Sequence, residues 1–316
     1  MNTISPYLLR VYNPTLEVND KGKIKKGFNS LLNDINGLDL FDLLKKFITT
    51  HNDKFYKVED DKRRKVYKFY DVKASNSNRF IYGWFLEGEY GLEKDIIDIN
   101  SSDIEFKRRL DNAEITKHFF YIKLPLLSRH GLVLLHNFNG NGVKTTFHDE
   151  IVAFTRPQLD CFVSMTPLSD ETSLKKWSKA VAKEIRLNKF IAQDDIADTI
   201  TDLGYEENNA FTLTVKPPIR GGNFGTLAEL TSKKKKDKPS KKLLAVEILS
   251  EHCKEVKTVF ELNGKRRTFR IGNGVSNILC EIEAPEELLE NPTPEFDELK
   301  KWAFEVAEEF SSEITP

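Results

Sequence analysis

A glycine-rich loop has the residue types that most directly suggest ligand chemistry. The stretch "HNFNGNGVKTTFHDEI", residues 136–151, follows an apolar run and precedes a segment with helical character. A strand, a glycine turn with a lysine and then a helix is an arrangement that binds phosphate groups. The spacing is not that of a nucleotide-hydrolase P-loop, because Phe138 stands where the first glycine belongs and Val143 separates Gly142 from Lys144.

A weaker anion site is still compatible with this loop. Thr145 or Thr146 can cap the helix, while Lys144 and the free backbone N–H groups offer positive charge to a single phosphate. Such a site contacts a nucleic-acid backbone without reading its bases. The alternative is a glycine turn followed by an ordinary capped helix.

Basic residues gather in three other segments, which are residues 61–68, 216–242 and 264–270. In the last segment, strand alternation would place Arg266, Thr268 and Arg270 on one face and Arg267 and Phe269 on the other. A basic strand face beside a basic loop predicts a groove that follows a phosphate backbone, with steep salt dependence. The alternative for the lysine run is a solvated loop. The candidate phosphate ligands, besides Lys144 and Thr145, are Lys216, Arg220, Lys234, Lys235, Arg266, Arg267 and Arg270.

The charge is distributed unevenly along the chain. Residues 211–275 contain 15 Lys and Arg against 6 Asp and Glu, a net charge of +9. Residues 276–316 contain 2 against 12, a net charge of −10. This division predicts a basic surface for a polyanion beside an acidic tail, or two halves that neutralise each other. If the acidic tail covers the basic surface, deletion of residues 292–316 should tighten DNA binding.

No motif for catalysis is apparent. The six histidines and three cysteines show neither HExxH nor zinc-site spacing, and the cysteines are typical of reduced thiols in a cytoplasm. A metal-dependent nuclease would have to use Asp194, Asp195 and Asp198, or His148 with Glu150. Helix capping and solvation also explain these carboxylates, so we expect no metal and no cofactor. The absence of a motif favours a protein that is not an enzyme but does not exclude catalysis, because catalytic groups converge in space rather than in sequence.

The pattern of apolar residues predicts an α+β fold of mainly antiparallel sheets with flanking helices, in two sub-domains. The expected domains are residues 1–155 and residues 156–316, the second with a basic loop at 231–242 and an acidic helix at 294–314. Other expected helices cover 28–51 with a break at Gly37, 145–154 and 170–191. A hairpin at 54–75, a glycine-turned strand pair near 79–91 and strands at 118–127 and 130–138 are also expected. No membrane helix or signal peptide is apparent, which favours a cytoplasmic protein.

The order of several segments is similar to one known family. "GFNSLLNDI", a charged aromatic hairpin, "HFFYI…GLVLLHNFNGNGVKTTFHDEI" and "FVSMTPLS" resemble the DNA-binding subunit of the phage lambda Rex exclusion system. The similarity covers about residues 25–190, and the basic insertion and the acidic tail depart from it. It implies an intracellular antiphage defence or phage-exclusion protein that binds DNA without strong sequence preference, as a homo-oligomer or with a defence-system partner protein.

The hypothesis from the sequence is therefore a cytoplasmic, non-enzymatic nucleic-acid-binding protein of antiphage type. Two other classes stay open. One is a metal-dependent nuclease effector of a defence system, and the other is a protein-interaction scaffold whose basic loop binds an acidic partner.

Overall fold

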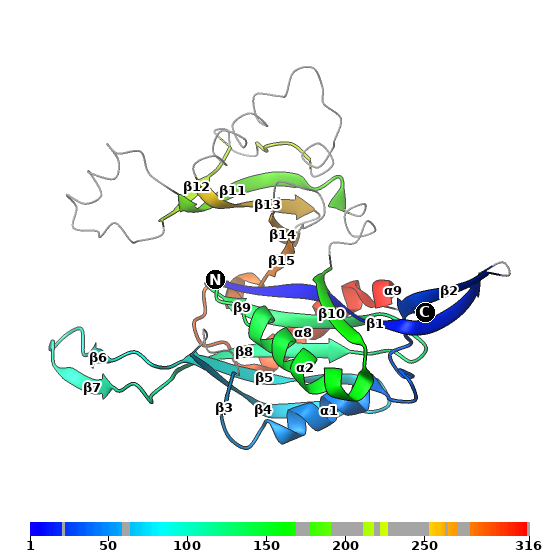
Figure 1. Cartoon of the computed structure of the whole chain (residues 1–316). Helices are drawn as coiled ribbons and strands as arrows, with labels where there is room; N and C mark the ends of the chain where they lie inside the picture. Colours follow the sequence, from blue (N-terminus) through cyan, green and yellow to red (C-terminus); the bar gives the residue numbers. More distant parts are fainter. Residues whose placement is uncertain are drawn as a thin grey trace. The chain divides into compact units, whose positions relative to one another are not determined.

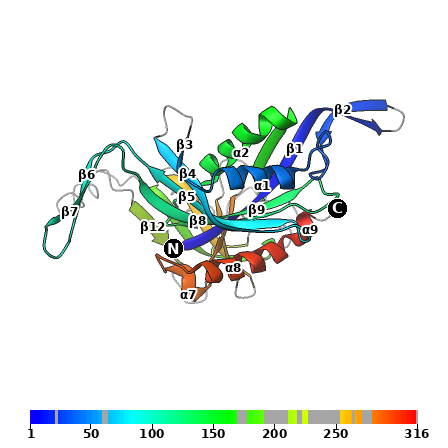
Figure 2. The same cartoon turned by 90° about the horizontal axis from the view of Figure 1, so that it is seen from below.

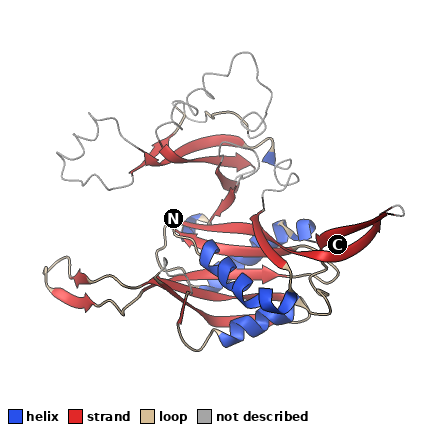
Figure 3. Ribbon diagram, in the orientation of Figure 1, coloured by secondary structure: helices blue, strands red, loops and turns tan. Residues whose placement is uncertain are grey.

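The computed structural model describes residues 1–20, 23–58, 64–168, 177–190, 211–217, 222–226, 253–262, 265–270 and 279–314 (Figure 1). Its contacts divide the chain into two compact units, which are Met1–Thr166 with Ala284–Pro316 (unit 1) and Pro167–Glu283 (unit 2). Strands outweigh helices in the described residues (Figure 3), and the expected α+β class with mainly antiparallel sheets is confirmed. Within these residues no helix has the length and apolar character needed to cross a membrane.

Unit 1 is built on an antiparallel sheet with the strand order β1-β9-β8-β5-β4-β3. Strands β2 and β10 also pair with β1. The sheet forms because its strands alternate aromatic or branched apolar side chains on both faces. The strand bounds are β1 Asn2–Asp20, β2 Lys23–Asn29, β3 Tyr56–Lys57, β4 Lys65–Ser75, β5 Phe80–Glu89, β8 Glu114–Lys123, β9 Gly131–Phe138 and β10 Phe162–Pro167.

Helices cover both faces of this sheet, as Figure 2 shows. Helices α1 (Leu40–Thr50) and α2 (Lys144–Leu159) lie on one face, where Phe85 meets Phe147 with ring centroids 5.3 Å apart. Helices α7 (Glu286–Leu289) and α8 (Phe296–Glu309) lie on the other, and α9 (Ser311–Ile314) follows them. There Phe304 lies 5.1 Å from Tyr121 between ring centroids. A sheet that is apolar on both faces needs two covering layers to bury its core.

An ion pair fixes helix α1 to the sheet. Asp39 caps the helix by accepting the Phe41 backbone N–H at 2.8 Å. The same carboxylate accepts two hydrogen bonds from Arg79, at 2.7 and 2.9 Å, and Arg79 also donates to the Leu124 carbonyl at 2.7 Å. One carboxylate therefore caps the helix and holds a mostly buried guanidinium in place.

The N-terminal strand meets the segment around helix α7 beside a buried histidine. Asn2 Nδ2 donates to the carbonyls of Leu288 at 2.5 Å and Asn291 at 2.7 Å. Its Oδ1 lies 2.9 Å from Nε2 of His136, which therefore donates this hydrogen bond. Nδ1 of His136 is buried without a partner, and burial lowers the pKa of this imidazole to about 3.

The C-terminal helix belongs to unit 1. Expected as part of a second domain, it instead buries Leu299, Trp302 and Val306 against the sheet of unit 1, because its apolar stripe has a partner there. Removal of residues 292–316 would expose that sheet face. The deletion proposed from the sequence would therefore measure loss of core packing as well as any effect on ligand binding.

Unit 2 contains an antiparallel sheet with the order β12-β11-β13-β14-β15. Strand β11 (Val181–Phe190) lies where the expected helix 170–191 would continue, so that prediction was wrong from residue 181 onward. The segment also alternates with period two, and pairing with both neighbours decides in favour of the strand. The other bounds are β12 Phe211–Val215, β13 Cys253–Leu262, β14 Lys265–Arg270 and β15 Leu279–Glu283.

Two local expectations in unit 1 also differ from the structure. Residues 30–38 form turns and isolated bridges instead of a first helix, with Asn36 and Gly37 both at positive φ. The expected strand pair near residues 79–91 is the single strand β5. Its glycines do not mark turns, because Gly83 and Gly88 lie where neighbouring backbone approaches too closely for a side chain.

Candidate functional site

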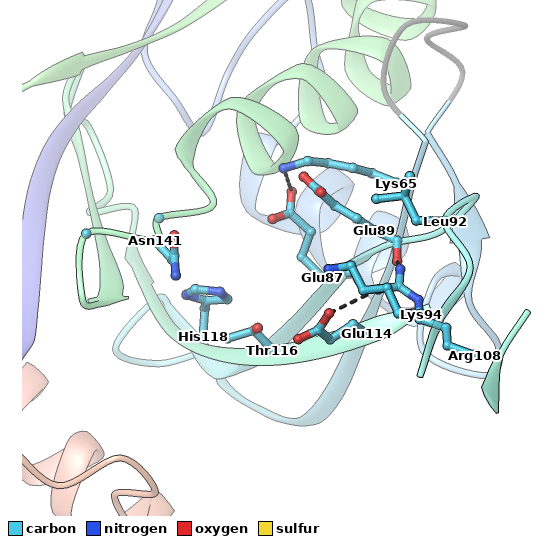
Figure 4. A pocket seen from close by; sticks show the side chains of 13 residues that line it. Lys65, Glu87, Glu89, Leu92, Lys94, Arg108, Glu114, Thr116, His118 and Asn141 are labelled. Carbon is cyan, nitrogen blue, oxygen red and sulfur yellow. Dashed lines mark hydrogen bonds and ion pairs between the residues drawn. The ribbon is translucent and has the colours of Figure 1, made fainter. Parts of the chain in front are cut away.

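A charged pocket of about 380 Å³ opens in unit 1 (Figure 4). It lies where β4, β5 and β8 continue past the N-terminus of α2, and the glycine-rich loop before α2 forms part of its wall. Its volume is within the range of small-molecule sites. The charged side chains are Lys65, Lys94, Arg108, Glu87, Glu89 and Glu114, and its other lining residues include Thr116, His118, Gly140, Asn141 and Gly142.

The strand register explains why charges gather here. Phe85 lies opposite His118, Glu87 opposite Thr116, and Glu89 opposite Glu114. Paired residues of an antiparallel sheet point to the same face, so this row changes from aromatic to charged along the strands. The change occurs where α2 no longer covers the sheet, because the uncovered positions are in contact with water.

Glu87 and Lys65 form a mostly buried ion pair on one wall. Lys65 Nζ donates to Glu87 Oε1 at 3.0 Å, and the hydroxyl of Thr146 donates to the same oxygen. Glu87 keeps 11% of its side-chain surface exposed, and its second oxygen, Oε2, has no hydrogen-bond partner in the described part of the chain. The pocket therefore offers one fixed carboxylate oxygen as an acceptor.

Arg108 closes another wall and is itself buried. Its Nη1 donates to Glu114 Oε2 at 3.0 Å, its Nε donates to the Asn112 carbonyl at 3.3 Å, and its Nη2 donates to the Glu89 carbonyl. Glu89 and Glu114 are opposite like charges, which is unfavourable on its own. The guanidinium offsets that repulsion and fixes the chain at the ends of β5 and β8.

His118 is a neutral base at the inner end of the pocket. Its side chain is 2% exposed, and Nδ1 lies 3.1 Å from the His136 carbonyl oxygen, so Nδ1 holds the proton. Burial lowers the pKa of His118, and the Coulombic effect of nearby Glu87 opposes this only in part. In the described residues Nε2 has no partner, and Asn141 points toward the ring in Figure 4. Nε2 can therefore accept a hydrogen bond from a ligand.

The loop before α2 makes a tight turn. Asn139 and Gly140 have φ of 50° and 81°, and Phe138 and Asn141 exchange backbone hydrogen bonds of 2.9 and 3.2 Å. Positive φ at both central residues is the geometry that Asn-Gly adopts in hairpin turns. At Gly142 a Cβ atom would lie 2.4 Å from Asn137 Oδ1, so a larger residue would have to displace that side chain.

The expected cap of α2 is absent. The N-cap is Val143, and no side chain accepts a hydrogen bond from the first turn. Thr145 is exposed, Lys144 is half-buried, and Thr146 donates to Glu87 instead. The expectation that Thr145 or Thr146 caps the helix was therefore wrong, because the helix begins at Lys144 and both threonines lie within its first turn. The N–H groups of the first turn have no side-chain acceptor.

The other predicted phosphate ligands do not gather into a groove in the described residues. In unit 2, exposed Lys216 lies 3.8 Å from Glu184, and exposed Arg266 lies 3.5 Å from Glu261. Arg267 is 5% exposed and stacks over Trp177 at 4.5 Å, so it supports the core. The predicted alternation in β14 is consistent with the register. Arg220, Lys234, Lys235 and the side chain of Arg270 lie outside the described part of the chain.

The carboxylates considered for a metal form no cluster in the described part of the chain. Across the described ranges, no three His, Cys, Asp or Glu side chains come together as a metal site. His148 and Glu150 are described, whereas Asp194, Asp195 and Asp198 lie outside the described residues. Cys161 and Cys280 are buried and form no disulfide bond in the described residues.

Sequence reasoning identified the loop and, through the basic segment 61–68, Lys65, but missed the acidic wall and the histidine of the pocket. Glu87 and His118 are far apart in the chain, and neither belongs to a motif. The available signal was the end of aromatic alternation in "FLEGE" and "EITKHFF", where polar side chains replace buried ones on one face. Reading that signal requires the register between the two strands.

Comparisons with known proteins give no relative from which the role of this site could be inferred. No protein-family model, no curated protein and no solved structure matches the chain.

Proposed function

We propose that this protein binds nucleic acid through phosphate contacts without strong sequence preference, with DNA favoured, and that the pocket of unit 1 receives one nucleotide of the bound strand. One observation carries the proposal. The loop that leads into a helix N-terminus without a side-chain cap lines one pocket together with cations and with acceptors that have no partner in the described residues.

The phosphate would bind beside α2. The N–H groups of its first turn carry partial positive charge, and no acidic side chain lies in that turn. Lys94 is exposed at the pocket wall, and Lys144 lies at the start of the helix. Neither lysine forms an ion pair in the described residues, so both are available to a phosphate.

The base or sugar would face hydrogen-bond acceptors rather than positive charge. Oε2 of Glu87 and Nε2 of His118 are acceptors, and they match the N–H and O–H donors of a nucleotide. A bare anion such as free phosphate would be repelled by the three carboxylates of the pocket. A ligand with an anionic group at one end and donors at the other fits both halves.

This arrangement limits how many phosphates are held. Lys216 and Arg266 lie near carboxylates, so they favour a backbone-tracking groove less than their sequence suggests. With about two phosphate contacts, binding of single strands should have a log–log salt slope of about −1.4. A long groove with six contacts would give about −4.

An antiphage role rests on the resemblance, in the order of several segments, to the DNA-binding subunit of the Rex exclusion system. It supplies the expectation of a homo-oligomer and of a defence-system partner. The cytoplasm is the corresponding location, because phage DNA is present there.

The test is fluorescence anisotropy with labelled single-stranded DNA, duplex DNA and RNA over a salt series, with and without magnesium. Lys94→Ala should weaken binding. The control Lys73→Ala removes the same charge from an exposed lysine of β4 that does not line the pocket, and it should weaken binding less. Equal weakening by both would move binding away from the pocket. Absence of binding to all three at low salt would refute the function, and magnesium-dependent cleavage would favour a nuclease.

His118→Asn separates the two halves of the pocket. Asparagine can keep the Nδ1-like donor to the His136 carbonyl but lacks an acceptor at the Nε2 position. We expect weaker binding of oligonucleotides with little change in salt slope, because the phosphate contacts remain. A changed slope with unchanged affinity would contradict the assignment of His118 to the base or sugar.

A further inference from the structure

A second feature of unit 1 is the segment that carries Lys94 and Arg108 of the pocket wall. Residues 92–110 form an arm that leaves the main sheet between β5 and β8 (Figure 1). Strands β6 (Lys94–Ile97) and β7 (Ile104–Arg108) pair only with each other, as a separate two-stranded sheet. Its large apolar side chains are between 48 and 87% exposed, and they include Ile96, Ile97, Ile99, Ile104 and Phe106.

Such an arm is unusual for an isolated protein. A lone two-stranded hairpin is marginally stable in water, and clustered exposed apolar side chains mark an interaction surface. Both outer edges also present unpaired backbone groups. The base of the arm is nevertheless fixed, because Arg108 is buried there and Gly91 N–H donates to the Leu110 carbonyl at 2.9 Å.

The charges along β7 identify the partner. The sequence from Asp103 to Arg109 is D-I-E-F-K-R-R, and its charges change sign about Phe106. Glu105 and Lys107 stand one residue to each side of Phe106, and Asp103 and Arg109 stand three residues to each side. These four side chains are exposed and form no ion pair in the described residues, although Lys107 lies opposite Asp95 in the register.

We infer that the arm binds the arm of a second copy of this chain, with β7 antiparallel to β7 around a two-fold axis at Phe106. In that register Glu105 faces Lys107 of the other copy, and Asp103 faces its Arg109, each pair occurring twice. Phe106 meets its own counterpart on the other face. The two hairpins become one four-stranded sheet, which covers the unpaired edge and part of the exposed apolar surface.

The register between β6 and β7 is irregular at Glu105. The register passes from Ile96 opposite Phe106 to Ile97 opposite Ile104, so Glu105 has no partner in β6. Bulges and charges on an edge strand oppose indiscriminate pairing. Because its charges change sign about Phe106, β7 pairs favourably with another copy of itself when the two strands run antiparallel.

A charge swap tests the inference by sedimentation over a concentration series. Lys107→Glu places like charges opposite each other twice and should raise the dimer dissociation constant about tenfold or more. Glu105→Lys should do the same. The double variant Glu105→Lys/Lys107→Glu restores opposite charges and should restore the dimer. A wild-type protein that stays monomeric, or a double variant no better than the single ones, would overturn the inference.

A cross-link tests the register. Residues on the two-fold axis of an antiparallel pair have Cα atoms about 4.5–5.5 Å apart, which a disulfide can bridge. Phe106→Cys should therefore form a covalent dimer under mild oxidation, and Ile97→Cys, an equally exposed control on β6, should not. Cross-linking of Ile97→Cys alone would overturn the β7 pairing. Nucleic-acid binding can fail without affecting either assay, so the two proposals are tested separately.

Discussion

Acidification should destabilise unit 1 through His136. This imidazole donates from Nε2 to Asn2, and its Nδ1 is buried without a partner. Protonation would place a charge and an unmatched donor in the core, so burial lowers the pKa of His136 from 6.5 to about 3. Because the folded pKa is lower, the unfolded chain binds more protons below pH 6.5. The contribution to stability is complete above pH 6.5 and is lost as the pH falls toward 3.

The magnitude follows from the size of the shift. Each pH unit below the unfolded pKa costs about 1.4 kcal/mol, so the loss between pH 7.5 and pH 5 is about 2 kcal/mol. His118 acts in the same direction, since burial lowers its pKa as well. Unfolding of unit 1 would therefore become easier at a pH where most surface carboxylates are still ionised.

The assay compares urea unfolding at pH 7.5 and pH 5 in the parent and in His136→Gln. Glutamine can keep the donor to Asn2 but does not titrate, and a constant destabilisation cancels in the difference between the two pH values. With Trp177→Phe as background, the remaining tryptophans, Trp84 and Trp302, both report on unit 1. The parent should lose about 2 kcal/mol more than His136→Gln. Equal losses would refute the argument.

Three further substitutions test the supports of the fold and the pocket. Asp39→Ala removes the cap of α1 and leaves Arg79 without its carboxylate, so urea unfolding should show a loss of about 3 kcal/mol, and a loss below about 1 kcal/mol would contradict it. Arg108→Ala should speed hydrogen exchange in residues 92–110 while the strands under α8 stay protected, because it frees the arm's base; unchanged exchange would show that other contacts hold it. Gly142→Ala places a methyl group against Asn137 and should weaken oligonucleotide binding in the anisotropy assay with little effect on unfolding, whereas full binding would show that the turn can shift.

Local sequence patterns were sufficient where one interpretation was strongly favoured. The apolar run at 131–138 and the amphipathic stripe of 296–309 gave the expected elements. Each combines a clear period with suitable neighbours, so local preference and tertiary packing agree. The glycine loop was also recognised as a possible ligand segment, and it lines the pocket.

The errors have a common cause. Residues 181–190 fit a helical stripe as well as a strand alternation, and pairing with β12 and β13 decides between them. Thr145 and Thr146 have the chemistry of caps, but they lie within the first turn of α2, and the hydroxyl of Thr146 donates to Glu87, which is distant in sequence. Arg267 looks like a phosphate ligand until Trp177 covers it. In each case a residue or strand distant in sequence determines the local structure or the role of the side chain, against the preference of the local sequence.

The sequence by itself determined the α+β class, several of the strands, the loop before α2 and the charge antisymmetry around Phe106, because these depend on neighbours along the chain. Tertiary structure decided which charges form the pocket, which helices cover the sheet of unit 1 and which histidines stay neutral. These depend on strand register and burial, and both arise only when segments distant in sequence pack together.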